Sequence, residues 1–258
     1  MITLKNINLS LGGRLILKNI NFSVAKGETK VILGPSGSGK SSILKIILGL
    51  WRPDSGRVVI DGKEMSGATN EEWDEARYHI GMIFQEGALF DSLTVGENVG
   101  YWLFEHTKMS EEEIEVRVRR ALSEVGLDPE IIDRMPDELS GGMRRRVAIA
   151  RALASLEPKI MLYDEPTTGL DPLAVDTILD QINSLQQRKE VTSLVVTHDI
   201  SDALKVSDRF IMIADGELIF EGNSKELRDS DHPFVAGFLA PFKNTLSRAL
   251  ASFGVENG

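Results

Sequence analysis

The sequence of 258 residues contains no cysteine and only four histidines. Without cysteine there are no disulfides and no thiolate metal sites, and the scattered histidines lack the spacing of a zinc or other transition-metal site. No apolar run approaches the roughly 20 residues that a membrane-spanning helix needs, and residues 1–6 do not resemble a secretory signal. We therefore expect a cytoplasmic, water-soluble chain whose metal, if any, arrives with a ligand.

Basic residues are outnumbered by acidic ones, 29 against 39, which gives a net charge of −10. Proteins that bind nucleic acid independently of sequence need a basic face to contact phosphates, so the charge balance argues against a nucleic-acid partner. Membrane and protein partners remain compatible with it. The length is sufficient for one large domain or two modest ones.

The most informative feature present is a phosphate-binding loop. Residues 34–41 fit the pattern G-x-x-x-x-G-K-[ST] between the apolar segments 30–33 and 43–48, flanks that a flexible linker lacks. Its small residues let successive backbone N–H groups point inward at a helix N-terminus and form an anion site. The residues predicted to contact phosphate are Gly34, Pro35, Ser36, Gly37, Ser38, Gly39, Lys40, Ser41 and Ser42.

Two residues of this loop have specific expected roles. Lys40 should reach the β- and γ-phosphates of a nucleoside triphosphate as a point charge. Ser41 should give its hydroxyl to Mg²⁺, which bridges the same phosphate oxygens. The sequence therefore predicts a nucleotide site that uses Mg²⁺.

Carboxylates and a histidine follow later apolar runs. Asp164 and Glu165 come directly after the run 159–163, and His198 follows the run 192–197, so all three should lie at carboxyl ends of parallel strands, where α/β proteins bind ligands. We expect Asp164 to hold Mg²⁺ and Glu165 to accept a proton from the attacking water as the general base. His198 can bond the γ-phosphate.

Other turn and helix signals organise the rest of the chain. Ser140, Gly141 and Gly142 precede an apolar helix and form a second surface suited to anions, although the same letters also serve ordinary helix caps. The dipeptides 61–62 and 215–216 are both Asp-Gly and predict hairpins. Between residues 87 and 139 the pattern is helical, with Ser110 and Glu113 forming a capping box.

Taken in this order, the motifs resemble those of the nucleotide-binding subunit of ATP-binding-cassette (ABC) transporters over nearly the whole chain. The resemblance implies an α/β fold of the P-loop NTPase (RecA-like) class, with an N-terminal antiparallel β subdomain and a helical subdomain. It implies a core from residues 1–86 and 143–225, a helical subdomain over 87–142 that carries the signature, and a C-terminal helical extension over 226–258. It also implies ATP hydrolysis coupled to transport.

The resemblance further implies that two copies sandwich two ATP molecules, so that Ser140 to Gly142 of one copy serve the ATP of the other. The implied catalytic residues are Glu165, His198 and Lys40. The implied metal contacts are Ser41, Gln85 and Asp164. Beyond the phosphate loop, the implied ATP contacts are Gln85, Ser140, Gly141, Gly142 and Asp171.

Two positions depart from the family pattern. Many members stack an aromatic residue on adenine just before a glycine near the N-terminus, where this chain has Leu11. Either Leu11 packs on the base or Arg14 stacks on it through its guanidinium plane, and the sequence leaves both open. Met143 replaces the glutamine that often follows the signature, a change expected to tune activity rather than abolish it.

The segment 85–99 resembles the ATPase of Mla-type phospholipid transporters, which maintain outer-membrane lipid asymmetry. This resemblance implies a peripheral protein on the cytoplasmic face of the inner membrane, with an accessory cytoplasmic subunit and a membrane permease as partners. Ala88, Leu89 and Phe90 would receive the permease, unless Phe90 fills this chain's own core. Another ABC transporter with a different cargo, or a soluble ABC ATPase without transport, remains an alternative. Cargo and direction depend on the partners.

The tail beyond Pro241 carries apolar residues at spacings that fall on one helical face. We expect this stripe to pack on a partner subunit or on the chain's own cassette. Its members are Phe242, Leu246, Ala249, Leu250 and Phe253.

Overall fold

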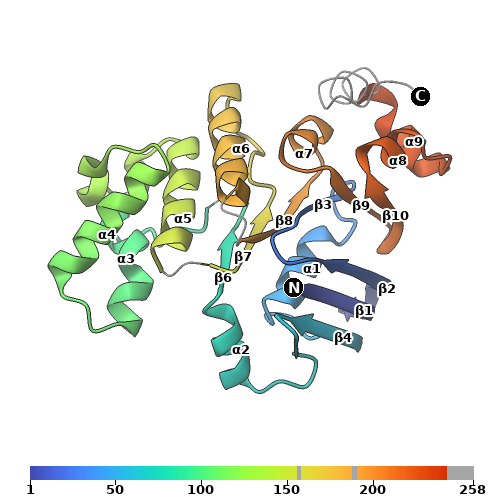
Figure 1. Ribbon diagram of the computed structural model, residues 1–258, viewed down its shortest axis with the longest axis horizontal. Coiled ribbons are helices and arrows are strands. Elements are labelled where there is room, and N and C mark those ends of the chain that lie inside the picture. The colour runs from blue at the N-terminus through green and yellow to red at the C-terminus, as the bar shows by residue number, and fades with distance from the viewer. Residues whose placement is uncertain (86, 156–157, 188–190, 243–258) are drawn as a thin grey trace.

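The computed structural model describes residues 1–85, 87–155, 158–187 and 191–242. Two β-sheets lie side by side, and helices surround the larger one (Figure 1). The smaller sheet is antiparallel, with the strand order β2-β1-β4-β5. Its strands are β1 (Ile2–Leu11), β2 (Arg14–Val24), β4 (Ser55–Ile60) and β5 (Lys63–Glu64).

The larger sheet has the order β10-β9-β3-β8-β7-β6. Its strands pair in parallel except at the edge, where β10 runs antiparallel to β9. Every residue of β3, β7 and β8 is buried, as expected for strands covered on both faces. The strands are β3 (Thr29–Leu33), β6 (Ile80–Ile83), β7 (Ile160–Asp164), β8 (Thr192–Thr197), β9 (Arg209–Ala214) and β10 (Glu217–Asn223).

Helices fill the connections between these strands. The α-helices are α1 (Lys40–Ile47), α2 (Asn70–Arg77), α3 (Val95–His106), α4 (Glu111–Glu124), α5 (Gly141–Ser155), α6 (Pro172–Gln187), α7 (Ile200–Val206), α8 (Ser224–Arg228) and α9 (Pro233–Leu239). Short 3₁₀ segments are η1 (Pro129–Asp133), η2 (Pro136–Glu138) and η3 (Ala240–Phe242). In Figure 1, α3, α4 and α5 form a group on one side of the larger sheet.

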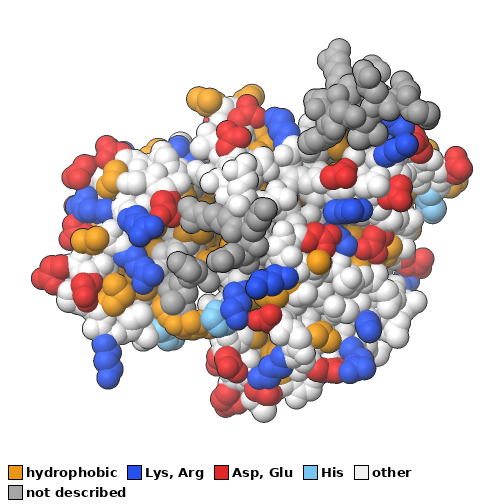
Figure 2. All heavy atoms as spheres, viewed as in Figure 1, with side chains coloured by type: hydrophobic (Ala, Val, Ile, Leu, Met, Phe, Trp, Pro, Cys, Tyr) orange, Lys and Arg blue, Asp and Glu red, His pale blue; other side chains and the backbone are white. Residues whose placement is uncertain are grey.

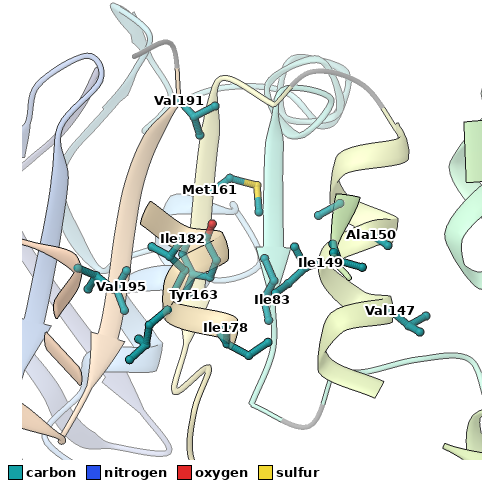
Figure 3. Close-up of a cluster of buried hydrophobic side chains, with 14 of the residues drawn as sticks. Ile83, Val147, Ile149, Ala150, Met161, Tyr163, Ile178, Ile182, Val191 and Val195 are labelled. Carbon is teal, nitrogen blue, oxygen red and sulfur yellow. The ribbon is translucent and has the colours of Figure 1, made fainter. Parts of the chain in front are cut away.

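A buried cluster joins that sheet to α5 and α6 and fixes the strand that ends at the site. Ile83 and Met161 of β6 and β7 face Ile149 of α5, while Tyr163 lies near Ile178 and Ile182 of α6 (Figure 3). Tyr163 is fully buried, and this burial raises the pKa of its phenol well above the usual value. β7 is thus held in a rigid apolar setting up to Asp164, its last residue.

Several local predictions are confirmed. The Asp-Gly pairs connect β4 to β5 and β9 to β10 as hairpins. At the capping box, the Ser110 N–H donates to Glu113 Oε2 at 2.8 Å and the Glu113 N–H donates to Ser110 Oγ at 3.3 Å. The domain boundaries stay predictions, and the stripe beyond Phe242 lies outside the described residues.

Candidate nucleotide site

The phosphate loop connects β3 to α1, and two of its glycines are required by close packing. Gly34 has φ +150°, and a Cβ there would lie 2.1 Å from the carbonyl oxygen of Ile213. Gly39 has φ +103°, and a Cβ there would lie 2.6 Å from Leu17 of β2. Only glycine combines these backbone angles with such close contacts. The loop is thereby anchored to both sheets.

The interior of the loop presents hydrogen-bond donors. Gly39 caps α1 and offers no side chain to the N–H groups of the first turn. Ser38 Oγ is buried and has no hydrogen-bond partner among the described residues. Gly37 has φ +80°, and no atom lies within 4 Å of the position its Cβ would take. Orphan donors around an open position at a helix N-terminus fit the oxygens of a phosphate.

Lys40 is buried and lies over this loop. Its Nζ donates to the carbonyl oxygens of Gly34 at 2.8 Å and Pro35 at 3.0 Å, and it lies 3.6 Å from Glu165 Oε1. Burial lowers the pKa of the Lys40 ammonium, and the Glu165 carboxylate opposes that shift. A phosphate arriving in the loop would offer this desolvated charge stronger partners than neutral carbonyls do.

Ser41 and Asp164 bring two hard oxygen donors together. Ser41 Oγ donates to Asp164 Oδ1 at 2.8 Å, which joins the first turn of α1 to the end of β7. Burial raises the pKa of Asp164, and the hydrogen bond from Ser41 and the charge of Lys40 oppose this rise. A hydroxyl and a desolvated carboxylate are donors that suit Mg²⁺.

The free-energy cost of burying the Asp164 carboxylate gives a prediction for Asp164→Asn in the absence of nucleotide. A raised pKa in the folded state means that ionised Asp164 destabilises the fold, a cost present above the raised pKa and relieved as the pH falls through it. We expect the Asn variant to melt a few degrees higher than wild type at neutral pH, with the difference shrinking in acid. Calorimetry from pH 5 to 8 measures this, and a variant that melts lower throughout would contradict it.

Glu165 is held by two side chains at the carboxyl edge of the sheet. Its Oε2 accepts a hydrogen bond from Thr168 Oγ1 at 3.0 Å and lies 2.9 Å from His198 Nδ1. The backbone of Glu165 has φ +48°, an uncommon value for a residue with a side chain. The fold therefore brings Lys40 and His198, which are distant in the sequence, to the adjacent pair Asp164 and Glu165.

Thr168 was not among the residues predicted for the site, and neither was Arg145. Arg145, on α5, is buried and donates hydrogen bonds to the backbone carbonyls of Glu165, Pro166 and Thr168. In the sequence it is one of three consecutive arginines, and helical periodicity is the only signal that could separate the inward one from its neighbours.

The remaining predicted residues lie outside this cluster. Ser140 is exposed at the start of α5, where its Oγ accepts from the Met143 N–H at 3.2 Å. Figure 1 shows α5 well apart from α1. Gln85 is exposed after β6, and Asp171 is exposed and caps α6 by accepting from the Ala174 N–H at 3.0 Å. The signature is therefore positioned to meet something other than this chain's own phosphate loop.

Leu11 and Arg14, the two residues predicted to contact the adenine base, are both accessible. Leu11 and Arg14 pair across the turn between β1 and β2, and both are exposed. The neighbouring Leu15 is also exposed, at 46%. The phosphate loop does not line the cavity of about 550 Å³ found elsewhere, between Lys26, Arg117 and Lys159. Within the phosphate loop, Ser36 and Gly37 are exposed, whereas Gly34, Ser38, Gly39 and Lys40 are buried.

Comparison with known proteins identifies the family. The family described as ABC transporter matches residues 17–168. The chain belongs to this family. Its fold is that of the family's P-loop ATPase cassette, and ATP hydrolysis is its activity. Among the described residues, each helix is too short or too polar to cross a membrane.

Relatives with different roles are similar over most of the chain. A Haemophilus influenzae intermembrane phospholipid transport ATP-binding protein, MlaF, is 41% identical over 93% of this chain and 90% of its own. The chloroplastic protein TRIGALACTOSYLDIACYLGLYCEROL 3 of Arabidopsis thaliana is 41% identical over 92% of this chain and 73% of its own. An Fe(3+) ions import ATP-binding protein, FbpC of Escherichia coli O157:H7, is 38% identical over 92% of this chain and 66% of its own.

Solved structures agree with the fold. A dimeric ATP-binding cassette in a post-hydrolysis state bound to ADP and Pi has a TM-score of 0.79 and 38% identity, covering 86% of this chain and 98% of that one. A component of an ABC transporter complex from Clostridium perfringens has a TM-score of 0.78 and 30% identity, covering 96% and 97%.

Proposed function

We propose that this chain is the ATP-hydrolysing subunit of a membrane transporter that moves phospholipid between membranes. The observation that carries the chemistry is the convergence of Lys40, Asp164 and Glu165 on one phosphate loop. Similarity to the phospholipid transport protein MlaF over 93% of the chain supports the cargo. An iron-import relative at 38% identity keeps a different cargo as the alternative.

The proposed chemistry is attack of water on the γ-phosphate of ATP, which yields ADP and phosphate. Glu165 takes the proton of that water. His198 and Thr168 hold the Glu165 carboxylate in place. Lys40 binds the β- and γ-phosphates. Ser41 and Asp164, with Gln85, would hold the Mg²⁺ that arrives with ATP, and the ion would neutralise phosphate charge there.

A second copy of the chain completes each site in this proposal. The tip of the phosphate loop, Ser36 and Gly37, is exposed, while Ser140, Gly141 and Gly142 lie at a separate helix N-terminus. A two-copy arrangement would bring these three residues, and Asp171 beside them, to the ATP of the partner. A dimeric cassette among the similar structures supports this arrangement.

A membrane permease is the proposed partner at residues 88–90. Ala88 is exposed, Phe90 is 45% exposed and packs on the ring of Tyr101 at 4.7 Å, while Leu89 is half-buried against the core. The alternative in which Phe90 fills the core is therefore wrong. An exposed aromatic pair beside Gln85 suits a helix of a membrane subunit.

The loop that presents Phe90 is firmly anchored, as a docking site requires. Buried Asn98 accepts from the Phe90 N–H at 2.8 Å and donates to the Phe90 carbonyl at 3.0 Å. Arg151 donates to the carbonyls of Ala88 at 2.8 Å and Gly87 at 3.1 Å. These hydrogen bonds tie the loop to α3 and α5, and in this proposal movement at Gln85 passes to Phe90.

The surface fits a protein partner better than nucleic acid. In the view of Figure 2, acidic and basic side chains are interspersed over the molecule and do not form a basic field. With a net charge of −10, the chain would repel phosphate backbones beyond its nucleotide site. The proposed location is the cytoplasmic face of the inner membrane, as a peripheral subunit beside an accessory cytoplasmic subunit.

The cargo is tested by isolating the tagged chain from its native membranes with its companions and reconstituting the complex in liposomes. ATP-dependent movement of labelled phospholipid between these liposomes and acceptor vesicles supports the proposal. ATP-dependent Fe(3+) uptake without lipid movement would assign the alternative cargo. Recovery of an active ATPase without membrane companions would favour a soluble function.

Phe90→Ala should uncouple transport from hydrolysis. The substitution removes an exposed aromatic anchor, a change that costs about 2 kcal/mol or more at interface hot spots, or roughly a 30-fold loss of affinity. We expect weaker co-purification of the permease and loss of lipid movement, with the basal ATPase of the isolated chain within about twofold of wild type.

The matched control is Phe234→Ala. Phe234 is also an exposed aromatic, at 37%, but it lies on α9, away from residues 88–90 (Figure 1). Assembly and transport should survive this change. Unchanged assembly and transport in Phe90→Ala would remove Phe90 from the docking surface.

A further inference from the structure

Arg145 connects the signature helix to the loop that carries the general base. It lies on α5, four residues after Gly141, and is only 7% exposed. Its Nη1 donates to the carbonyl of Glu165 at 3.1 Å and to that of Pro166, and its Nη2 donates to the carbonyl of Thr168 at 2.9 Å. One planar guanidinium thus gathers three carbonyls of a single turn.

These carbonyls belong to the backbone that sets the Glu165 side chain. Glu165 has φ +48°, a conformation that costs free energy and persists only where the surroundings enforce it. Arg145 also bonds to the carbonyl of Thr168, whose Oγ1 donates to Glu165 Oε2 at 3.0 Å. Arg145 therefore constrains the carboxylate through its own backbone and through Thr168.

The signature is packed onto the same structural unit. A Cβ on Gly142 would lie 2.9 Å from the Cβ of Ala174, in the first turn of α6. This helix begins just after residues 165–171, the catalytic loop. A Cβ on Gly141 would lie 3.6 Å from Leu170. The N-terminus of α5 thus packs against Leu170 and Ala174, while Arg145 of the same helix bonds to residues 165–168.

We propose that Arg145 is a positioning residue that holds Glu165 in its catalytic orientation from the signature helix. This inference rests on the proposed role of Glu165 as general base. Because the signature is proposed to contact the ATP of a second copy, Arg145 would place the base of one site under the control of the helix that serves the other.

The test compares Arg145→Met and Arg145→Lys with wild type in steady-state ATPase assays and in equilibrium nucleotide binding. A misplaced base costs about 10- to 100-fold in rate, so kcat should fall by this amount in Arg145→Met. The Kd for ATP should stay within about twofold, because the hydrogen bonds that Arg145 donates to Glu165 and Thr168 hold the catalytic loop and not the groups that bind phosphate. Lysine keeps the charge but loses the fork, so it should restore only part of kcat.

Arg146→Met is the matched control. Arg146 is the next residue on α5, and its Nη1 donates to the carbonyl of Gly126 at 2.9 Å, away from the catalytic loop. It should keep kcat within about twofold of wild type. A second readout is a double-mutant cycle on kcat with Thr168→Val. Since both residues act on one carboxylate, their effects should combine non-additively.

Arg145→Met with kcat within twofold of wild type, or with losses of kcat and ATP affinity that match each other, would overturn the proposal. Additive effects with Thr168→Val would also overturn it. If Arg145→Met does not fold, the same measurements on Arg145→Lys decide. An active Glu165→Gln enzyme would instead overturn the assignment of Glu165 as general base. An inactive Glu165→Gln together with a fully active Arg145→Met would overturn only the positioning role of Arg145.

Discussion

Glu165→Gln should bind ATP normally and lose most of its turnover. The amide keeps the size of the side chain, and its carbonyl oxygen can still accept from Thr168, but it cannot take a proton from water. General-base catalysis contributes about 10²- to 10⁴-fold, and we expect kcat to fall by that amount. Without hydrolysis to release it, the ATP-bound dimer should accumulate and be visible by size-exclusion chromatography.

Glu217→Gln is the control for this change. It removes the same charge from an exposed glutamate of β10 that pairs at 3.2 Å with Lys18, and exposed pairs contribute little. Its ATPase rate should match wild type. Hydrolysis by Glu165→Gln at a rate near wild type would show that another group accepts the proton.

The parts of the site that lie at strand ends could be predicted from the sequence. Asp164 and His198 lie at the ends of β7 and β8, whose apolar centres are buried because strands of a parallel sheet are covered on both faces. The parallel order then places their carboxyl ends on one edge, where the phosphate loop also lies because it follows β3, the strand that pairs with β8. Spacing and hydrophobicity were sufficient for this part.

The contacts that hold Glu165 could not be predicted in this way. Thr168 and Arg145 act through hydrogen bonds that exist only once the chain has folded and α5 has packed against β6 and α6, and neither residue type marks such a role by itself. Tertiary packing decides which of the arginines at 144–146 turns inward. The positive φ of Glu165 likewise leaves no trace in a residue that is not glycine.

The segment 70–83 contains α2 and β6, which apolar periodicity in the sequence does not predict. Its helix, α2, has one buried residue, Trp73, so the apolar periodicity is almost absent. The capping box that starts it was readable: Thr69 accepts from the Glu72 N–H, and Glu72 accepts from the Thr69 N–H at 2.9 Å. β6, the strand that follows, is only four residues long.

Lys40→Ala should weaken nucleotide binding itself and not turnover alone. Lys40 is buried among the carbonyls of Gly34 and Pro35 and the carboxylate of Glu165. Its loss therefore removes a desolvated positive charge from the phosphate loop. Truncating one partner of a buried, hydrogen-bonded charge pair costs roughly 2–5 kcal/mol. The Kd for ATP should therefore rise by about 30-fold or more, which titration calorimetry measures directly.

Two further variants separate charge from packing. Lys40→Met keeps most of the apolar length, so its affinity should be as poor as that of Lys40→Ala if the ammonium is what binds phosphate. Lys205→Ala removes an exposed lysine that pairs with Asp176 at 2.7 Å and should leave the Kd unchanged. An ATP affinity in Lys40→Met close to wild type would mean that the orphan N–H groups of α1 and Ser38 Oγ hold the phosphates without the lysine.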